Sequence, residues 1–101
     1  MRRRATIAAG VMLLVAAMQV SAADIGRGAQ LYRLHCASCH GPTGVSAMPG
    51  TPNVARGTTL MQPDTLLLAS IRSGRNAMPG YVGILKDQEI LDVIAFMRTM
   101  R

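Results

Sequence analysis

The sequence predicts an all-α fold with three main helices and long loops, and two observations support this. Apolar and small residues recur at three- and four-residue steps in the segments 24–37, 63–73 and 87–100, which is the spacing of one helix face. The stretches between them are rich in Gly, Pro, Thr and Asn, and no run of β-branched residues alternates with a period of two. We therefore expect a small helical domain.

The first 23 residues have the pattern of a secretory signal peptide. Residues 2–4 are arginines, residues 5–20 are mostly apolar, and residues 21–23 are small, as at an A-x-A-like cleavage site. As a helix, the apolar run would span only ~24 Å, against ~30 Å for the hydrocarbon core of a bilayer. An uncleaved membrane anchor remains the alternative. We expect residues 1–23 to be removed, a mature chain that starts at Ala23 or Asp24, and a periplasmic domain over residues 24–101.

Charge and size restrict what this domain can be. It carries eight basic and five acidic side chains, and a scattered net charge of +3 does not indicate nucleic-acid binding. A domain of 78 residues obtains only ~3–5 kcal/mol from a hydrophobic core alone. The three aromatic side chains are Tyr32, Tyr81 and Phe96. We therefore expect a bound cofactor to fill the core and to give the long loops a surface on which to pack.

The first helix is expected from Asp24 to about Ala37, where its small and apolar residues share one face. The second is expected to begin at Pro63, because proline is favoured at the first helical position, and to stop before Gly74. Its predicted broad buried stripe consists of Leu66, Leu67, Ala69, Ser70 and Ile71.

The third helix is expected from Asp87 to about Met100. Acidic residues at its start and Arg98 near its end suit the helix dipole. Lys86 stands where a Ser or Asp cap would be expected, so the start is weaker than it could be. Among the remaining methionines, Met61 and Met97 are expected to fill the core, and Met100 to do so or to lie in a frayed end.

The pentad "CASCH" at residues 36–40 carries the strongest chemical signal. Cys-x-x-Cys-His is the attachment signature of a c-type haem. Two cysteines three positions apart near a helix end can form thioethers to the two vinyl groups of the porphyrin, and His40 then lies under the iron as an axial ligand. Haem attachment follows export, in agreement with the signal peptide. We interpret Cys36 and Cys39 as the covalent attachment points.

Two other interpretations of the pentad compete with haem. A dithiol or disulfide motif would lack its usual βαβ context and would give His40 no role. A zinc site would use both cysteines together with His35 and His40, but each histidine directly adjoins a cysteine in the chain, so the four side chains would converge poorly.

Around the pentad, the sequence resembles the small monohaem class I cytochromes c. The resemblance covers residues 24–101 and rests on "GAQLYRLHCASCHG", "TPN", "AMPGY" and "DQEILDVIAFMR". It implies three main helices and long loops wrapped around one covalently bound haem c. It also implies close contact between the first and last helices, with Gly28 allowing the approach and Tyr32 and Phe96 packing over it.

The second axial ligand has two candidates, because "AMPG" occurs at both Met48 and Met78. The chain from His40 to Met48 can span ~28 Å when extended, so reach alone does not exclude Met48. In the family that this chain resembles, a proline carbonyl about twelve residues after the axial histidine accepts a hydrogen bond from that histidine, and Pro52 stands there. A loop that holds Pro52 on the histidine side cannot easily deliver Met48 to the other side. The resemblance therefore implies His40 and Met78 as axial ligands.

Two weaker hypotheses concern polar residues near the haem. Arg56 would pair with a haem propionate, and Asn76 would orient the Met78 loop. For each, a solvated side chain is the alternative.

A His/Met-ligated iron leaves no open position for a substrate, so we expect one-electron transfer and no enzymatic activity. The expected partners are a quinol-oxidising complex or dehydrogenase as donor and a nitrite reductase or oxidase as acceptor, with no nucleic acid and no stable membrane insertion after cleavage. A monomer is expected. A basic rim for docking would consist of Arg72, Arg75 and Lys86.

Within the family, the short chain and the segments "MQPD" and "IRSGRNAMPGY" are similar to the cytochrome c-55X group, which is encoded with the nitrite reductase of denitrifying bacteria. This similarity implies donation of electrons to nitrite reductase, or an accessory role in maturation of its special haem. A haem-based gas-binding sensor is the alternative from another class, and it would require displacement of Met78.

Overall fold

The computed structural model describes residues 3–6, 8–13 and 22–100. Half of the predicted apolar run of the signal peptide, residues 7 and 14–20, lies outside the described residues, as does Ser21 of the predicted cleavage site. The stretches 3–6 and 8–13 are exposed and have no regular secondary structure. Among the described residues, no helix has the length and apolar character needed to cross a membrane.

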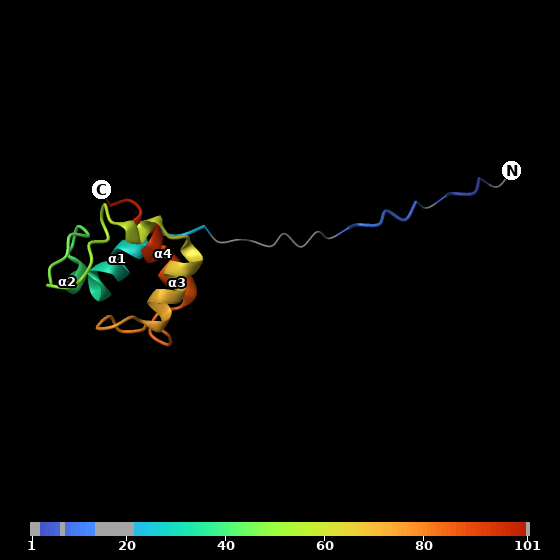
Figure 1. Cartoon of the computed structure of the whole chain (residues 1–101). Helices are drawn as coiled ribbons and strands as arrows, with labels where there is room; N and C mark the ends of the chain where they lie inside the picture. The colour runs from blue at the N-terminus through green and yellow to red at the C-terminus, as the bar shows by residue number, and fades with distance from the viewer. Residues whose placement is uncertain (1–2, 7, 14–21, 101) are drawn as a thin grey trace.

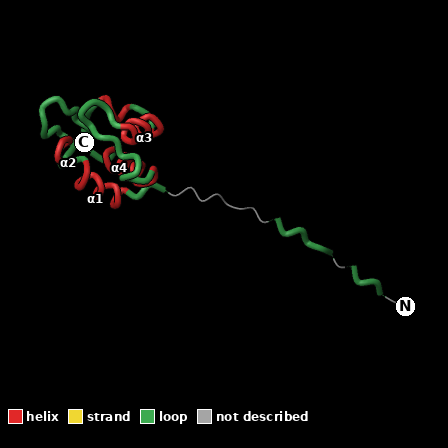
Figure 2. Tube along the Cα trace, turned by 90° about the horizontal axis from the view of Figure 1, so that it is seen from below, coloured by secondary structure: helices red, strands yellow, loops and turns green. Residues whose placement is uncertain are grey.

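The described residues form four α-helices and one 3-10 helix. They are α1 (Ile25–His35), α2 (Ala37–His40), η1 (Thr58–Met61), α3 (Asp64–Ser73) and α4 (Asp87–Met97) (Figure 1). The described part of the chain contains no strand, and long loops make up much of the domain (Figure 2). The predicted all-α architecture, with three main helices, is confirmed.

The first predicted helix is interrupted at the pentad. Asp24 caps α1, since its carboxylate accepts a hydrogen bond from the Arg27 backbone N–H at 2.9 Å. The helix ends at His35 with Cys36 as its C-cap, and α2 follows as a single turn that ends at Gly41. Gly41 has a φ of +79°, and a Cβ there would lie 1.8 Å from the Val45 carbonyl oxygen. The pentad therefore spans a helix break, and not the end of one continuous helix over residues 24–37.

Helix α3 differs from the prediction in its start and in its buried face. Pro63 is the N-cap in extended conformation (ψ 155°), so the helix starts one residue later. Its end at Gly74 is as predicted. The broad buried stripe was wrong: Leu67 is buried and Ile71 is half-buried, whereas the other three residues of the stripe are exposed. The helix packs on α4, and Leu67 and Ile71 are the residues of the predicted stripe that reach the buried cluster.

Helix α4 starts with half of a capping box. The Glu89 side chain accepts the backbone N–H of Lys86 at 3.0 Å, and this bond compensates in part for the poor cap residue. The helix ends at Met97, earlier than the expected Met100, with Arg98 as its C-cap. Met97 is buried and Met100 is half-buried, but Met61 is 82% exposed, so the assignment of Met61 to the core was wrong.

Helices α1 and α4 are in close contact where Gly28 faces Asp92. A Cβ at Gly28 would lie 2.0 Å from the Asp92 carbonyl oxygen, so no other residue permits this approach. The rings of Tyr32 and Phe96 meet edge to face beside the crossing, with centroids 5.5 Å apart. This is the helix contact that the resemblance implied.

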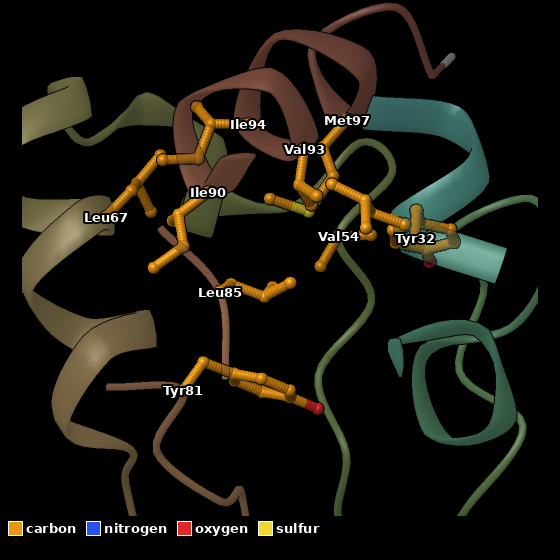
Figure 3. Packing of buried hydrophobic residues seen from close by; sticks show 10 residues of the cluster. Tyr32, Val54, Leu67, Tyr81, Leu85, Ile90, Val93, Ile94 and Met97 are labelled. Carbon is orange, nitrogen blue, oxygen red and sulfur yellow. The ribbon is translucent and has the colours of Figure 1, made fainter. Parts of the chain in front are cut away.

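A single buried cluster joins the helices to the loops (Figure 3). Tyr81 lies at one end of it in Figure 3. Half-buried Cys36, Ala37 and Met78 also pack against the cluster. Its members are Leu31, Tyr32, Val54, Leu67, Tyr81, Leu85, Ile90, Val93, Ile94 and Met97. The core thus reaches both the pentad and the Met78 loop.

Candidate haem site

The pentad presents its side chains at the break between α1 and α2. Cys36, Cys39 and His40 are each half-buried, and the two cysteines do not pair in a disulfide. The His40 Nδ1 atom lies 3.0 Å from the Pro52 carbonyl oxygen. Since a carbonyl can only accept, Nδ1 must carry the proton in this contact, which leaves the lone pair on Nε2. The imidazole is therefore oriented with a free nitrogen on its far side.

The loop that carries Pro52 is held to the pentad by several hydrogen bonds. The Ala47 N–H donates to the Cys39 carbonyl at 3.0 Å, and the Asn53 side chain accepts the Ser46 N–H at 2.6 Å. The buried Tyr32 hydroxyl donates to the Gly41 carbonyl at 2.7 Å. The resemblance implied that a Pro-Asn pair, here Pro52 and Asn53, runs along the histidine side of the haem, but it gave the Asn53 amide no contact of its own. That amide in fact holds the loop that places Pro52.

Met78 lies in a tightly built turn. The Arg75 and Met78 backbones exchange two hydrogen bonds, of 3.0 and 2.9 Å, across a turn in which Asn76 has a φ of +53°. Gly74 and Gly80 flank the turn, and a Cβ on either would lie within 2.8 Å of backbone atoms. The turn is thus packed against the end of α3.

Met48, the other candidate, has different surroundings. Its side chain is 49% exposed and is not among the residues that pack on the buried cluster. Met78 is half-buried and packs on the same cluster as Cys36. The two copies of "AMPG" are alike in sequence but not in their packing.

Tyr81 links the Met78 loop to the pentad. Its hydroxyl donates to the His35 carbonyl at 2.9 Å, and its ring meets the His35 ring edge to face at 5.7 Å between centroids. Its backbone N–H donates to the carbonyls of Ile71 and Arg72, at 3.1 and 3.0 Å. His35 is therefore a packed neighbour, and sequence reasoning missed the role of Tyr81 because its partner lies far along the chain.

The surroundings of the pentad are of low polarity. Burial raises the pKa of the Cys36 thiol to about 11, with the nearby Cys39 as the second cause. Burial likewise raises the pKa of Tyr32 to about 12 and raises the pKa of Tyr81.

The zinc interpretation of the pentad is not supported by the arrangement of side chains. In the part of the chain that the structure describes, no three His, Cys, Asp or Glu side chains gather as metal ligands.

The remaining predicted polar residues lie on the surface. Arg56, with a φ of +57°, lines a shallow depression of about 380 Å³ together with Val45, Asn53, Ala55 and Gly57. Asn76 is exposed and contributes a left-handed backbone to the Met78 turn; its side chain makes no hydrogen bond among the described residues. Arg72 pairs with Asp87 at 2.9 Å, so one member of the predicted basic rim is partly neutralised.

These residues fit a covalently attached haem. A c-type haem needs two cysteines for thioethers and two axial donors for its iron. Cys36 and Cys39 are not paired in a disulfide, the His40 imidazole has one nitrogen engaged by Pro52, and the Met78 thioether is half-buried. The apolar cluster that Cys36 and Met78 share supplies a wall for the macrocycle.

Comparisons with known proteins agree with this chemistry. A family model described as "Cytochrome C oxidase, cbb3-type, subunit III" matches residues 23–97. Cytochrome c6 of Thermosynechococcus vestitus is 33% identical over 78 residues, which cover 75% of this chain and 70% of the relative. Cytochrome c6 of Parathermosynechococcus lividus is 32% identical over 77 residues, covering 74% and 88%.

Solved structures show the same fold. Cytochrome c6 from the diatom Phaeodactylum tricornutum superposes with a TM-score of 0.64 at 26% identity, covering 75% of this chain and 92% of that one. The KustC0563 c-type cytochrome superposes with a TM-score of 0.65 over 73% and 96%, and at 22% identity it supports the fold alone.

The sequence match and the fold together establish the cofactor and the class of protein. The chain carries one covalently bound c-type haem with its iron, and it is an electron carrier and not an enzyme. It belongs to the small monohaem class I cytochromes c.

Proposed function

We propose that this cytochrome is a periplasmic one-electron carrier with His40 and Met78 as axial ligands and with Cys36 and Cys39 bound as thioethers. The observation that carries the proposal is the setting of Met78, which sits in a tightly hydrogen-bonded turn on the same apolar cluster as Cys36. Met48 lacks that setting.

The haem supplies the one-electron couple of its iron, and the chain holds the ligands in place. Pro52 keeps the His40 ring in one tautomer and one orientation. The Met78 turn is tied to α3 through backbone hydrogen bonds and glycine contacts, so the backbone that carries the sulfur is held in place. Ligands that stay in place in both oxidation states favour electron transfer, and methionine ligation together with burial favours a raised reduction potential.

The same rigidity argues against a haem-based gas sensor. A gas molecule would need the sixth position, so Met78 would have to leave the iron. Any displacement that also moved the Met78 backbone would break the two hydrogen bonds of the turn or the contacts of Gly74 and Gly80 with their neighbours. No feature of the described residues favours such a displacement.

Export and processing complete the proposal. Residues 1–23 would be a cleaved signal peptide, and residues 24–101 would be the cytochrome domain. The start of the family match at residue 23 supports this division. The partner that we propose is the nitrite reductase of denitrification, on the similarity of "MQPD" and "IRSGRNAMPGY" to the cytochrome c-55X group. Arg75 and Lys86 would form the docking charges, since Arg72 already pairs with Asp87.

The ligand set is tested with two matched variants, Met78→Ala and Met48→Ala, of the haem-loaded protein. The absorption band of methionine-ligated ferric haem should vanish in Met78→Ala and persist in Met48→Ala. The opposite pattern would assign the iron to Met48 and overturn this part of the proposal.

The partner is tested by stopped-flow mixing of the reduced protein with oxidised nitrite reductase at several salt concentrations. Rapid oxidation that slows as salt rises would support donation and a charged docking surface. If the protein is not oxidised while its methionine band stays intact, the role in maturation of the nitrite reductase remains. In that case, a strain that lacks this cytochrome should produce nitrite reductase without its special haem.

A further inference from the structure

Asp92 is the charged residue that lies buried within the described part of the chain, with a relative exposure of 5%. Its Oδ1 atom accepts two hydrogen bonds, one from the backbone nitrogen of Asp24 at 2.8 Å and one from Gln88 Nε2 at 3.0 Å. Both donors are neutral in the intact chain. A carboxylate buried this deeply is costly unless an opposite charge accompanies it.

No ion pair within the described part of the chain involves Asp92. The Arg27 guanidinium lies 3.2 Å from Glu89, and the Asp24 side chain is occupied in capping α1 through the Arg27 backbone N–H. Gln88 is neutral and shares the same oxygen of Asp92. Among the described residues, Asp92 therefore has hydrogen-bond donors but no positive charge as a partner.

Cleavage between Ala23 and Asp24 would create that charge at the atom that already contacts Asp92. Hydrolysis of this peptide bond by a signal peptidase consumes one water, leaves a carboxyl group on Ala23 and frees the Asp24 nitrogen as an amine, which takes up a proton at neutral pH. Ala23 and Asp24 are exposed and precede α1, so the bond is accessible.

We propose that removal of residues 1–23 places the new α-ammonium of Asp24 on the Asp92 carboxylate, so that processing completes a partly buried ion pair between the start of α1 and α4. The inference rests on the proposed cleavage of the signal peptide and not on the axial ligands. Cleavage one residue earlier would leave a neutral amide at Asp92 and move the amine away by the length of one residue, ~3.8 Å. The position of the cut therefore matters to the stability of the domain.

The experiment compares two precursors exported and loaded with haem in the same host. One is the natural chain, and the other has a glycine inserted between Ala23 and Asp24, so that cleavage after Ala23 leaves a neutral amide at Asp92. Intact mass gives each N-terminus, the haem spectrum reports the ligands, and chemical denaturation gives stability. We expect the natural chain to start at Asp24 and the glycine insertion to lower the folding equilibrium constant about five- to tenfold, because a charge-assisted hydrogen bond becomes a neutral one.

Asp92→Asn, made in both precursors, isolates the pair. In this variant the glycine insertion should change stability less than about twofold, since no carboxylate remains to pair with the amine. A natural N-terminus other than Asp24, or equal stability of the two proteins that keep Asp92, would overturn the inference. Should the Asp92→Asn proteins fail to fold, the two proteins that keep Asp92 still decide the matter. If all four proteins have the same haem spectrum, the result of this test does not bear on the proposed axial ligands.

Discussion

The hydroxyl of Tyr81 donates a hydrogen bond to the main-chain carbonyl of His35 at 2.9 Å, although the two residues are 46 positions apart. His35 directly precedes Cys36, and Tyr81 follows Met78 by three positions. One side chain thus joins the two segments that we propose to hold the haem from its opposite faces.

Tyr81→Phe should loosen that connection while keeping the ring. We expect a loss of about 1 kcal/mol in the free energy of unfolding, as for one hydrogen bond. We also expect imidazole to bind the ferric protein several-fold faster, because the Met78 turn is less firmly placed.

Tyr32→Phe is the matched control. It removes another hydroxyl bond to a main-chain carbonyl, that of Gly41, on the His40 side. It should lower stability comparably but leave the rate of imidazole binding unchanged. Equal rates for the two variants would show that Tyr81 does not position the Met78 turn.

Gly28→Ala tests the contact between α1 and α4. The added Cβ would lie 2.0 Å from the Asp92 carbonyl, so the helices would have to move apart. We expect the free energy of unfolding to fall by about 1–3 kcal/mol, as for overpacked sites. Gly26→Ala in the same helix meets nothing nearer than 3.5 Å and should be neutral or stabilise by about 0.5–1 kcal/mol. Denaturant titrations of both proteins measure the difference, and similar losses would contradict the assigned contact.

Arg98 forms hydrogen bonds with the segment that runs from η1 to the start of α3. Its guanidinium donates to the carbonyls of Leu60 and Gln62, at 2.6 and 2.9 Å, and to the Asp64 carboxylate at 2.7 and 3.0 Å. The sequence indicated only a favourable charge at the end of a helix. Because the site is partly exposed, we expect Arg98→Ala to cost about 1–2 kcal/mol, and Arg98→Lys to recover only part of this since lysine lacks the planar fork.

Arg33→Ala serves as the control for this prediction. Arg33 is exposed on α1 and makes no ion pair among the described residues. Its removal should change the free energy of unfolding by no more than about 0.5 kcal/mol. If thermal or chemical unfolding gives the same result for both arginines, the hydrogen bonds of Arg98 contribute nothing.

Glu89 should make stability depend on pH in the acid range. The hydrogen bond from the Lys86 backbone N–H is the main cause that lowers the pKa of this carboxyl, and Arg27 adds to it. A carboxyl with a lowered pKa in the folded state stabilises above its ordinary value of 4.5, and the contribution disappears as pH falls through the folded value. The natural protein should therefore exceed Glu89→Gln in stability at neutral pH, and the difference should vanish in acid. A difference that stays constant down to about pH 3 would point to packing and not to charge.

The sequence by itself determined the features that arise from neighbouring residues. The three main helices, the end of α3 at Gly74 and the loop character between them follow from periodicity and from Gly and Pro placement, which act within a few residues. The pentad is also local, because the spacing of its residues is the chemical signal. The roles of His40 and Met78 remain predictions, although the structure does bring His40 next to Pro52.

The tertiary structure alone decided the features that depend on which segments meet. The break at Cys36 and the burial of Leu67 beside exposed Leu66 follow from where the core lies and not from helical periodicity. The bonds of Asp24 to Asp92 and of Tyr81 to His35 join residues 68 and 46 positions apart. No local pattern specifies such pairs, because their atoms come together only when α1, α4 and the Met78 loop pack on one core.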